Sequence, residues 1–215
     1  EIIIMLSLIT LIPSILMLMT CFTRIIIVLS FLRNALGIQQ APPNQVLIGI
    51  ALFLTLFIMA PVFSEINQNA YTPYKEEKIT QEQFLKEASV SMKKFMIKQA
   101  KKEDINLFID LSKTEIKTVG ENGQKLTNNE ILMELPMTTI IPAFVTSELK
   151  RAFTMGFFIF LPFLLIDMVV SSVLMSMGMV MLPPAMISLP FKLLLFVLVD
   201  GWGLLMQTLV KSFIQ

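Results

Sequence analysis

The sequence predicts an all-α membrane protein in which two long apolar helical hairpins flank a small, soluble helical insert. First, 55% of the 215 residues are hydrophobic and only 15% are charged, with a mean hydropathy of +0.74, whereas soluble domains are about 25% charged. Second, residues 64–140 hold 11 of the 17 Lys and Arg and 12 of the 16 Asp and Glu. Third, the strict alternation that indicates strands is scarce. We therefore divide the chain into residues 1–63, 64–140 and 141–215.

The rarest residue types exclude several classes of protein. The chain contains no His and a single Cys, Cys21. Its composition therefore provides no imidazole base for a triad, no ordinary zinc site and no intrachain disulfide. We find neither a nucleophile motif nor a Gly-rich phosphate loop in the sequence. A net charge of +1 argues against nucleic acid as a partner. We expect no enzyme activity, no cofactor and no metal.

The first apolar segment is predicted to form a helical hairpin. Ile2–Met19 lacks the basic start and small-residue cleavage pattern of a signal peptide, so we interpret it as a helix of the mature protein. The next apolar run ends at R-N-A-L-G, where Gly37 is expected to terminate a helix. After A-P-P-N at 41–44, Val46–Phe63 supplies 18 uncharged residues, which is enough to span a bilayer.

The polar insert is predicted to be soluble and mostly helical. T-Q-E-Q at 80–83 and T-N-N-E at 127–130 both match the capping-box pattern that opens a helix. After the first box, apolar residues recur at helical spacing and predict the buried face of a helix: Phe84, Leu85, Ala88, Met92, Phe95 and Met96.

The second apolar segment repeats the plan of the first. It contains the apolar run Phe153–Met175, a Met-rich stretch at 175–186, and a second run, Phe191–Val210. The tips of both predicted hairpins carry a Pro-Pro pair, in A-P-P-N and in L-P-P-A. The shared plan indicates a structural repeat.

The loop charges predict an orientation in the membrane. Arg24 and Arg33 flank the first tip, so the positive-inside tendency places that tip in the cytoplasm. With two spans in each half, the insert and both ends of the chain are then expected outside the cytoplasm.

Several charged residues interrupt or border the apolar runs: Arg24, Arg33, Glu148, Asp167, Lys192 and Asp200. A charge at mid-bilayer costs roughly 2.5–3.5 kcal/mol on insertion scales, so we expect pairing within or between subunits. The alternative is an ion or proton pathway through Asp167 and Asp200, which predicts a secondary transporter. Because Lys150 and Arg151 follow Glu148, the default interpretation there is a solvated or interfacial helix start.

The Met-rich stretch begins M-S-M-G-M-V-M-L-P at 175–183, and five of the 12 residues 175–186 are Met. A spacing of two places successive side chains on opposite sides of a helix, which predicts a loop instead of a helical stripe. Met is unbranched and adapts to irregular surroundings. Gly178 permits unusual backbone angles, and Pro183-Pro184 ends the stretch.

Residues 23–62, 141–153 and 160–202 resemble the FliP family of flagellar type III export-gate proteins. The matching motifs include R-N-A-L-G and V-D-G-W. The resemblance implies a non-enzymatic membrane protein, five copies of which form a ring with FliQ- and FliR-like subunits at the flagellar basal body. Unfolded flagellar substrates pass through this gate across the bacterial inner membrane. The resemblance also implies that the apolar helices are tilted and bent in the assembled gate.

In this family, a methionine-rich loop after the third hydrophobic segment closes the channel. The resemblance assigns the seal to a stretch whose candidate residues are Met175, Met177, Gly178, Met179, Val180 and Met181. Val180 interrupts the Met run of this chain, so Met179 and Met181 are the principal candidates. The alternative interpretation is that the methionines pack a core.

Overall fold

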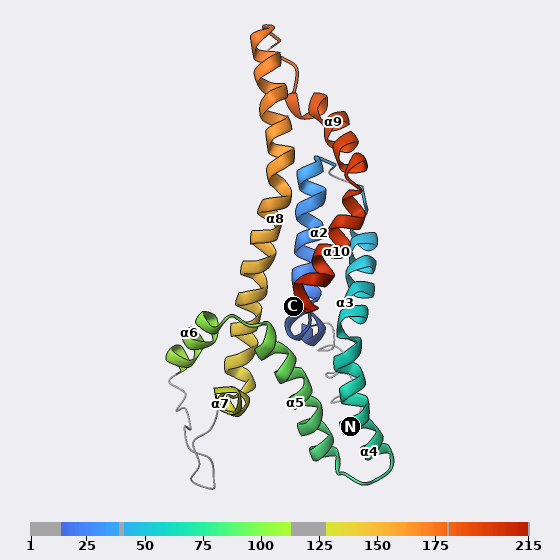
Figure 1. The fold of residues 1–215 in the computed structure, drawn as a ribbon, viewed down its shortest axis with the longest axis vertical. Coiled ribbons are helices and arrows are strands. Elements are labelled where there is room, and N and C mark those ends of the chain that lie inside the picture. The colour runs from blue at the N-terminus through green and yellow to red at the C-terminus, as the bar shows by residue number, and fades with distance from the viewer. Residues whose placement is uncertain (1–13, 39–40, 113–127, 180, 215) are drawn as a thin grey trace, which may run out of the picture. The chain divides into compact units, whose positions relative to one another are not determined.

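The structure, a computed structural model, describes residues 14–38, 41–112, 128–179 and 181–214 (Figure 1). Every regular element in these ranges is helical, which confirms the predicted helical class. Residues 14–19 are helical. The elements that follow are α2 (Phe22–Leu36), α3 (Asn44–Ile66), the π-helical turn η1 (Asn67–Tyr71), α4 (Thr72–Lys75), α5 (Gln81–Gln99), α6 (Lys102–Ser112), α7 (Asn128–Glu134), α8 (Met137–Ser176), α9 (Pro184–Leu198) and α10 (Gly201–Ile214).

The chain forms two compact units, each of which is described below by itself. Unit 1 contains the described residues up to Thr23 together with Leu56–Leu149. Unit 2 contains Arg24–Thr55 and the described residues from Lys150 onward. The segment boundaries at residues 63 and 140 stay a prediction from the sequence.

Two stretches of helix are long and apolar enough to cross a membrane. They are Asn44–Lys75, which comprises α3, η1 and α4, and α8. A third span is possible if α9 and α10, which meet at a bend of 63°, act as one. The predicted run Phe191–Val210 is thus divided between two helices. The predicted run Ile2–Met19 lies largely outside the described residues.

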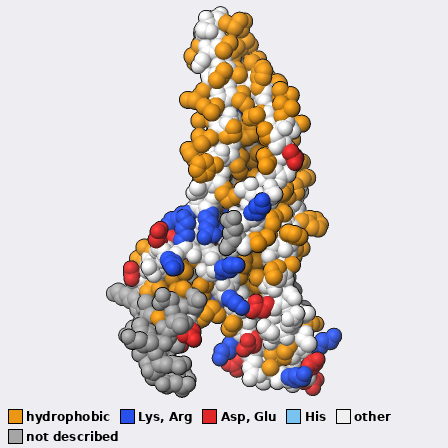
Figure 2. Space-filling view, in the orientation of Figure 1, with side chains coloured by type: hydrophobic (Ala, Val, Ile, Leu, Met, Phe, Trp, Pro, Cys, Tyr) orange, Lys and Arg blue, Asp and Glu red, His pale blue; other side chains and the backbone are white. Residues whose placement is uncertain are grey.

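Helix α8 is longer than the hydrophobic thickness of a membrane. Its 40 residues extend about 60 Å at 1.5 Å per residue, whereas the hydrocarbon core is about 30 Å thick. An upright α8 would therefore extend beyond the core. The predicted run Phe153–Met175 occupies its C-terminal half, and Figure 2 shows hydrophobic side chains covering much of the visible surface of this half.

The N-terminal cap of α5 in unit 1 confirms a sequence prediction. The Thr80 side chain accepts a hydrogen bond from the Gln83 backbone, and the Gln83 side chain accepts one from the Thr80 backbone. Met96 is fully buried as predicted, but Leu85 is 59% exposed, so its assignment to the buried face was wrong. The second predicted box begins at Thr127, outside the described residues, immediately before α7.

Unit 1 has its own hydrophobic core, formed by α5, α6, α8 and the segment before α8. Its buried members are Met96, Ala100, Ile105, Ile109, Leu135, Ile140, Ala143 and Phe144. At its edge, Lys93 Nζ donates to the Met133 carbonyl at 2.5 Å. Burial lowers the pKa of Lys93 from its usual range, and the charge of Glu134 opposes part of this change.

A buried polar cluster fixes the start of α6 against α8 in unit 1. Ser147 Oγ donates to Asp104 Oδ2 at 2.7 Å and accepts from the Lys101 backbone N–H at 2.9 Å. Ser147 is fully buried and Asp104 is 1% exposed. Buried polar groups are tolerated when they are hydrogen-bonded in this way.

In unit 2, α2 and α8 approach closely at Gly156. A methyl group at this position would lie 2.5 Å from ring atoms of Phe31 on α2. The Phe31 ring also makes an edge-to-face contact with Phe153, with a centroid distance of 5.3 Å. Gly156 therefore provides the space in which Phe31 packs.

We predict that Gly156→Ala destabilises the protein by about 1–3 kcal/mol, the usual effect of overpacking a close contact. Gly49→Ala is the matched control, because it also replaces a helical glycine but no atom lies within 4 Å of the added methyl group. Thermal unfolding in mild detergent measures both variants. Equal unfolding midpoints for Gly156→Ala and Gly49→Ala would show that the Phe31 contact does not constrain α8.

Candidate functional site

The methionine stretch starts at a well-formed helix terminus. Gly178 has a φ of +74°, and its N–H donates to the Met175 carbonyl at 3.1 Å. The Met179 N–H donates to the Leu174 carbonyl at 3.0 Å. These two bonds and the left-handed glycine form a Schellman motif, which satisfies the last carbonyls of α8 and turns the chain away from the helix axis.

The methionines point away from the interior of their own chain. The exposed fractions are 69% for Met175, 63% for Met177, 43% for Met179 and 98% for Met181. Packing in a core of the same chain therefore does not explain them. Met175 lies on the last turn of α8, whereas Met179 and Met181 lie outside the helices. Val180 lies outside the described residues.

The stretch ends where α9 begins. Pro183 is the N-cap residue with an extended backbone, and Pro184 is the first helical residue. Proline suits this position because its missing N–H would have no partner in the first turn of a helix. The irregular segment between α8 and α9 is thus delimited by Gly178 on one side and by Pro183-Pro184 on the other.

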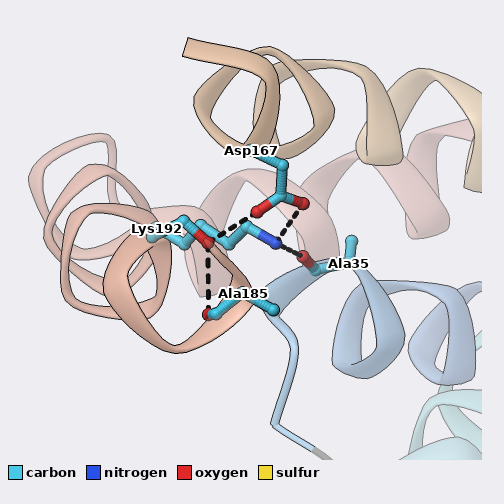
Figure 3. A network of polar contacts seen from close by, with 5 residues as sticks. Ala35, Asp167, Ala185 and Lys192 are labelled. Carbon is cyan, nitrogen blue, oxygen red and sulfur yellow. Dashed lines mark hydrogen bonds and ion pairs between the residues drawn. The ribbon is translucent and has the colours of Figure 1, made fainter. Parts of the chain in front are cut away.

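Lys192 of α9 connects three helices of unit 2, namely α2, α8 and α9 (Figure 3). Its Nζ lies 2.6 Å from Asp167 Oδ2 on α8 and donates to the Ala35 carbonyl on α2 at 3.1 Å. Lys192 is 5% exposed. Ala35 lies in the last turn of α2, where the carbonyl end of the helix dipole favours a cation. The predicted pairing of intramembrane charges is therefore found within one chain at this position.

Ser188 completes the Lys192 network. Its hydroxyl donates to Asp167 Oδ1 at 2.6 Å, so both oxygens of this carboxylate have a donor. We did not identify Ser188 or Ala35 as site residues from the sequence. The spacing of four between Ser188 and Lys192, which places both on one face of a helix, was the available signal for Ser188. A backbone carbonyl such as that of Ala35 leaves no signal in the sequence.

Arg24 forms a second connection between distant segments of unit 2. It is fully buried, and its Nη1 donates to Ser212 Oγ at 2.9 Å and to the Ser212 carbonyl at 3.1 Å. The guanidinium carbon lies 3.6 Å from the centroid of the Phe213 ring, a cation–π geometry. Arg24 thereby binds the C-terminal turn of α10.

The other predicted polar residues have different surroundings. Asp200 is exposed, and its side chain accepts a long hydrogen bond, 3.4 Å, from the Gly203 N–H; within the described residues it has no ion pair. Arg33 donates to the Asn44 side chain, which connects the end of α2 to the start of α3.

Glu148 is fully buried in unit 1, so the interpretation as a solvated helix start was wrong for this residue. Helix α8 begins at Met137, so Glu148 lies within the helix and not at its start.

We predict that Asp167→Ala reduces the yield of folded, assembled protein, whereas Asp167→Asn largely preserves it. The alanine leaves the buried Lys192 ammonium without its counter-ion, whereas asparagine still accepts hydrogen bonds from Lys192 and Ser188. Breaking a buried pair costs about 3–5 kcal/mol, and the effect here is smaller because the Asp167 side chain is 32% exposed. Size-exclusion chromatography in mild detergent measures the yield.

The double variant Asp167→Ala/Lys192→Met is the control for this prediction. It removes both charges, so it should recover part of the yield lost in Asp167→Ala. Equal yields for wild type and Asp167→Ala would contradict a structural role of the pair. Normal assembly with abolished ion coupling would instead support the transporter alternative.

Comparison with known proteins identifies the family of this chain. Residues 5–209 match the FliP family. Three relatives carry the name flagellar biosynthetic protein FliP. That of Bacillus subtilis is 54% identical over 213 residues, or 99% of this chain and 91% of the relative. That of Buchnera aphidicola subsp. Acyrthosiphon pisum is 50% identical over 204 residues, or 95% of this chain and 51% of the relative, so the chain spans about half of its length. That of Pectobacterium carotovorum is 50% identical over 210 residues, or 98% of this chain and 77% of the relative. A match over nearly its whole length and relatives of this identity establish that the chain belongs to the FliP family.

Proposed function

We propose that this chain is a channel subunit of the flagellar type III protein export gate in the bacterial inner membrane. Unfolded flagellar substrates pass through the gate, and the methionine stretch seals it when it is closed. Family membership and helices long enough to span a membrane support this function. The observation that carries it is a set of four exposed methionines at an irregular turn between α8 and α9.

The chemistry of the stretch suits a deformable seal. Thioether side chains exclude water but have three rotatable bonds, so they close around one another and yield to a polypeptide of any sequence. The Schellman turn holds the base of the stretch, while Met181, at 98% exposure, buries almost none of its surface against the described residues. Irregular backbone at membrane depth is tolerated where it lines a cavity or is buried in protein.

The proposed assembly is a ring of five copies with FliQ- and FliR-like subunits at the flagellar basal body. Each chain contributes two apolar hairpins, and its insert lies outside the cytoplasm. The exposed apolar residues of α8 support an assembly, because in a single chain each of them leaves more than half of its surface uncovered: Phe153, Phe157, Phe158, Leu165, Met168 and Val169. Contiguous apolar surfaces of this kind mark contacts with protein or membrane.

A secondary transporter receives less support from the geometry. Both oxygens of Asp167 already accept hydrogen bonds, from Lys192 and from Ser188. Asp200 lies at the junction of α9 and α10, and within the described residues it shares no hydrogen bond with this network. The two carboxylates therefore do not form one relay.

We predict that Met179→Ala/Met181→Ala makes the membrane permeable to ions. Each substitution removes a flexible thioether and leaves a gap that a small methyl group does not close. Ion leakage in cells that express the gate, measured with a membrane-potential dye, and secretion of flagellar substrates report on the two parts of the function.

Met17→Ala is the matched control, because Met17 is 47% exposed in the helical residues 14–19 and lies outside the methionine stretch. We expect neither leakage nor a change in secretion from it. If the double variant leaves both leakage and secretion unchanged, the seal is not formed by these residues.

A further inference from the structure

The junction of α9 and α10 has a defined backbone geometry. The two helices meet at a bend of 63°. The helix α9 closes with hydrogen bonds from Val199 N–H to the Leu195 carbonyl and from Asp200 N–H to the Val197 carbonyl. Asp200 then adopts a φ of +50°, and its carbonyl accepts the first hydrogen bond of α10 from the Leu204 N–H at 3.0 Å. Asp is among the few non-glycine residues that enter this left-handed region readily.

Side-chain packing restricts the same junction. A methyl group at Gly201 would lie 2.2 Å from ring atoms of Phe196, and one at Gly203 would lie 2.2 Å from Asp200 Oδ2. The Phe196 ring is buried and packs edge-to-face against Trp202, with a centroid distance of 5.5 Å. Gly201 and Gly203 thus lie at positions in the bend where a larger side chain would collide with Phe196 or with Asp200.

Helix α2 contacts both arms of this bend. Near its N-terminus, Arg24 binds Ser212 and stacks on Phe213 at the end of α10. In its last turn, the Ala35 carbonyl binds Lys192 of α9. The two contacts lie 11 residues apart on α2, or about 16 Å along a helix. One uninterrupted helix therefore contacts α9 and α10 on either side of the bend.

We propose that α2 is a brace that fixes the angle between α9 and α10, and through it the position of the methionine stretch. Pro184, the first residue of α9 after the exposed Met181, lies 8 residues before Lys192, or about 12 Å along the helix. When the Lys192 contact is released, α9 is free to rotate about Asp200 at its C-terminal end. This rotation moves the methionine stretch, which lies at the N-terminal end of α9. The part of this inference that concerns sealing rests on the proposed function.

Spin labels on the two arms test the brace directly. Cysteines replace Met186 of α9, which is 72% exposed, and Gln207 of α10, which is also exposed, in a chain whose buried Cys21 is changed to Ser. The labelled chain is assembled with an excess of unlabelled chain and with its partner subunits, so that distances within one chain dominate. Pulsed electron paramagnetic resonance measures the distance distribution.

In the labelled chain without further substitution, we expect one narrow distribution of the distance between the two labels. In Lys192→Met, we expect this distribution to be at least twice as wide, and we expect ion leakage. Ser212→Ala/Phe213→Leu weakens the contact of Arg24 with α10 without removing a charge, and it should also broaden the distribution if Lys192→Met fails to assemble. Lys211→Gln, which removes an exposed lysine of α10, is the control and should leave the distribution narrow.

The outcomes separate this inference from the proposed function. An unchanged distribution in Lys192→Met, or in Ser212→Ala/Phe213→Leu where Lys192→Met does not assemble, overturns the brace, whatever the leakage. A broadened distance distribution without ion leakage supports the brace and overturns its coupling to the seal. The Met179→Ala/Met181→Ala double variant tests separately whether these methionines form the seal.

Discussion

The arrangement of unit 2 depends on the burial of one ammonium group. Lys192 is 5% exposed, and a charge removed from water is tolerated only when it is paired and hydrogen-bonded. Asp167 of α8 and the Ala35 carbonyl of α2 supply that compensation. Because the two acceptors come from different helices, α9 satisfies its lysine only where α2 and α8 approach it together. The Asp167–Lys192 pair therefore serves mainly to specify the position of α9, and its net contribution to the free energy of unfolding is small.

The methionine stretch connects the two helices that the Asp167–Lys192 pair joins. It lies between α8, which carries Asp167, and α9, which carries Lys192, and both ends are closed by local motifs: the Schellman turn at Gly178 and the proline pair at 183–184. The segment is thus anchored at its base and exposed at its tip. That combination is what a seal requires, because a seal must return to one closed geometry after it has yielded to a substrate.

Local motifs were predictable from the sequence, and tertiary contacts were not. The capping box at Thr80 and the left-handed Gly37 at the end of α2 follow from short-range hydrogen bonding and were confirmed. The burial of Glu148 and the exposure of Leu85 depend on which helix face meets a neighbour, so residue type alone gave the wrong answer. The break after Leu198 was missed because hydropathy averages over Asp200, whereas the backbone angle of that single residue divides the helix. Among the site residues, the methionines and the Asp167–Lys192 charges were recognisable, but their backbone and serine partners were not.

The most direct test of the account is whether the methionine stretches of several copies meet. A Met181→Cys variant in a Cys21→Ser background places a single thiol at the most exposed methionine of the stretch. We predict that a short bismaleimide cross-links this thiol between two copies in the purified complex and gives a covalent dimer, the largest product that one thiol per chain allows. An intact complex in which the thiol reacts with a lipid-soluble maleimide but forms no cross-links would contradict it, since the stretch would then face the membrane and not a shared channel.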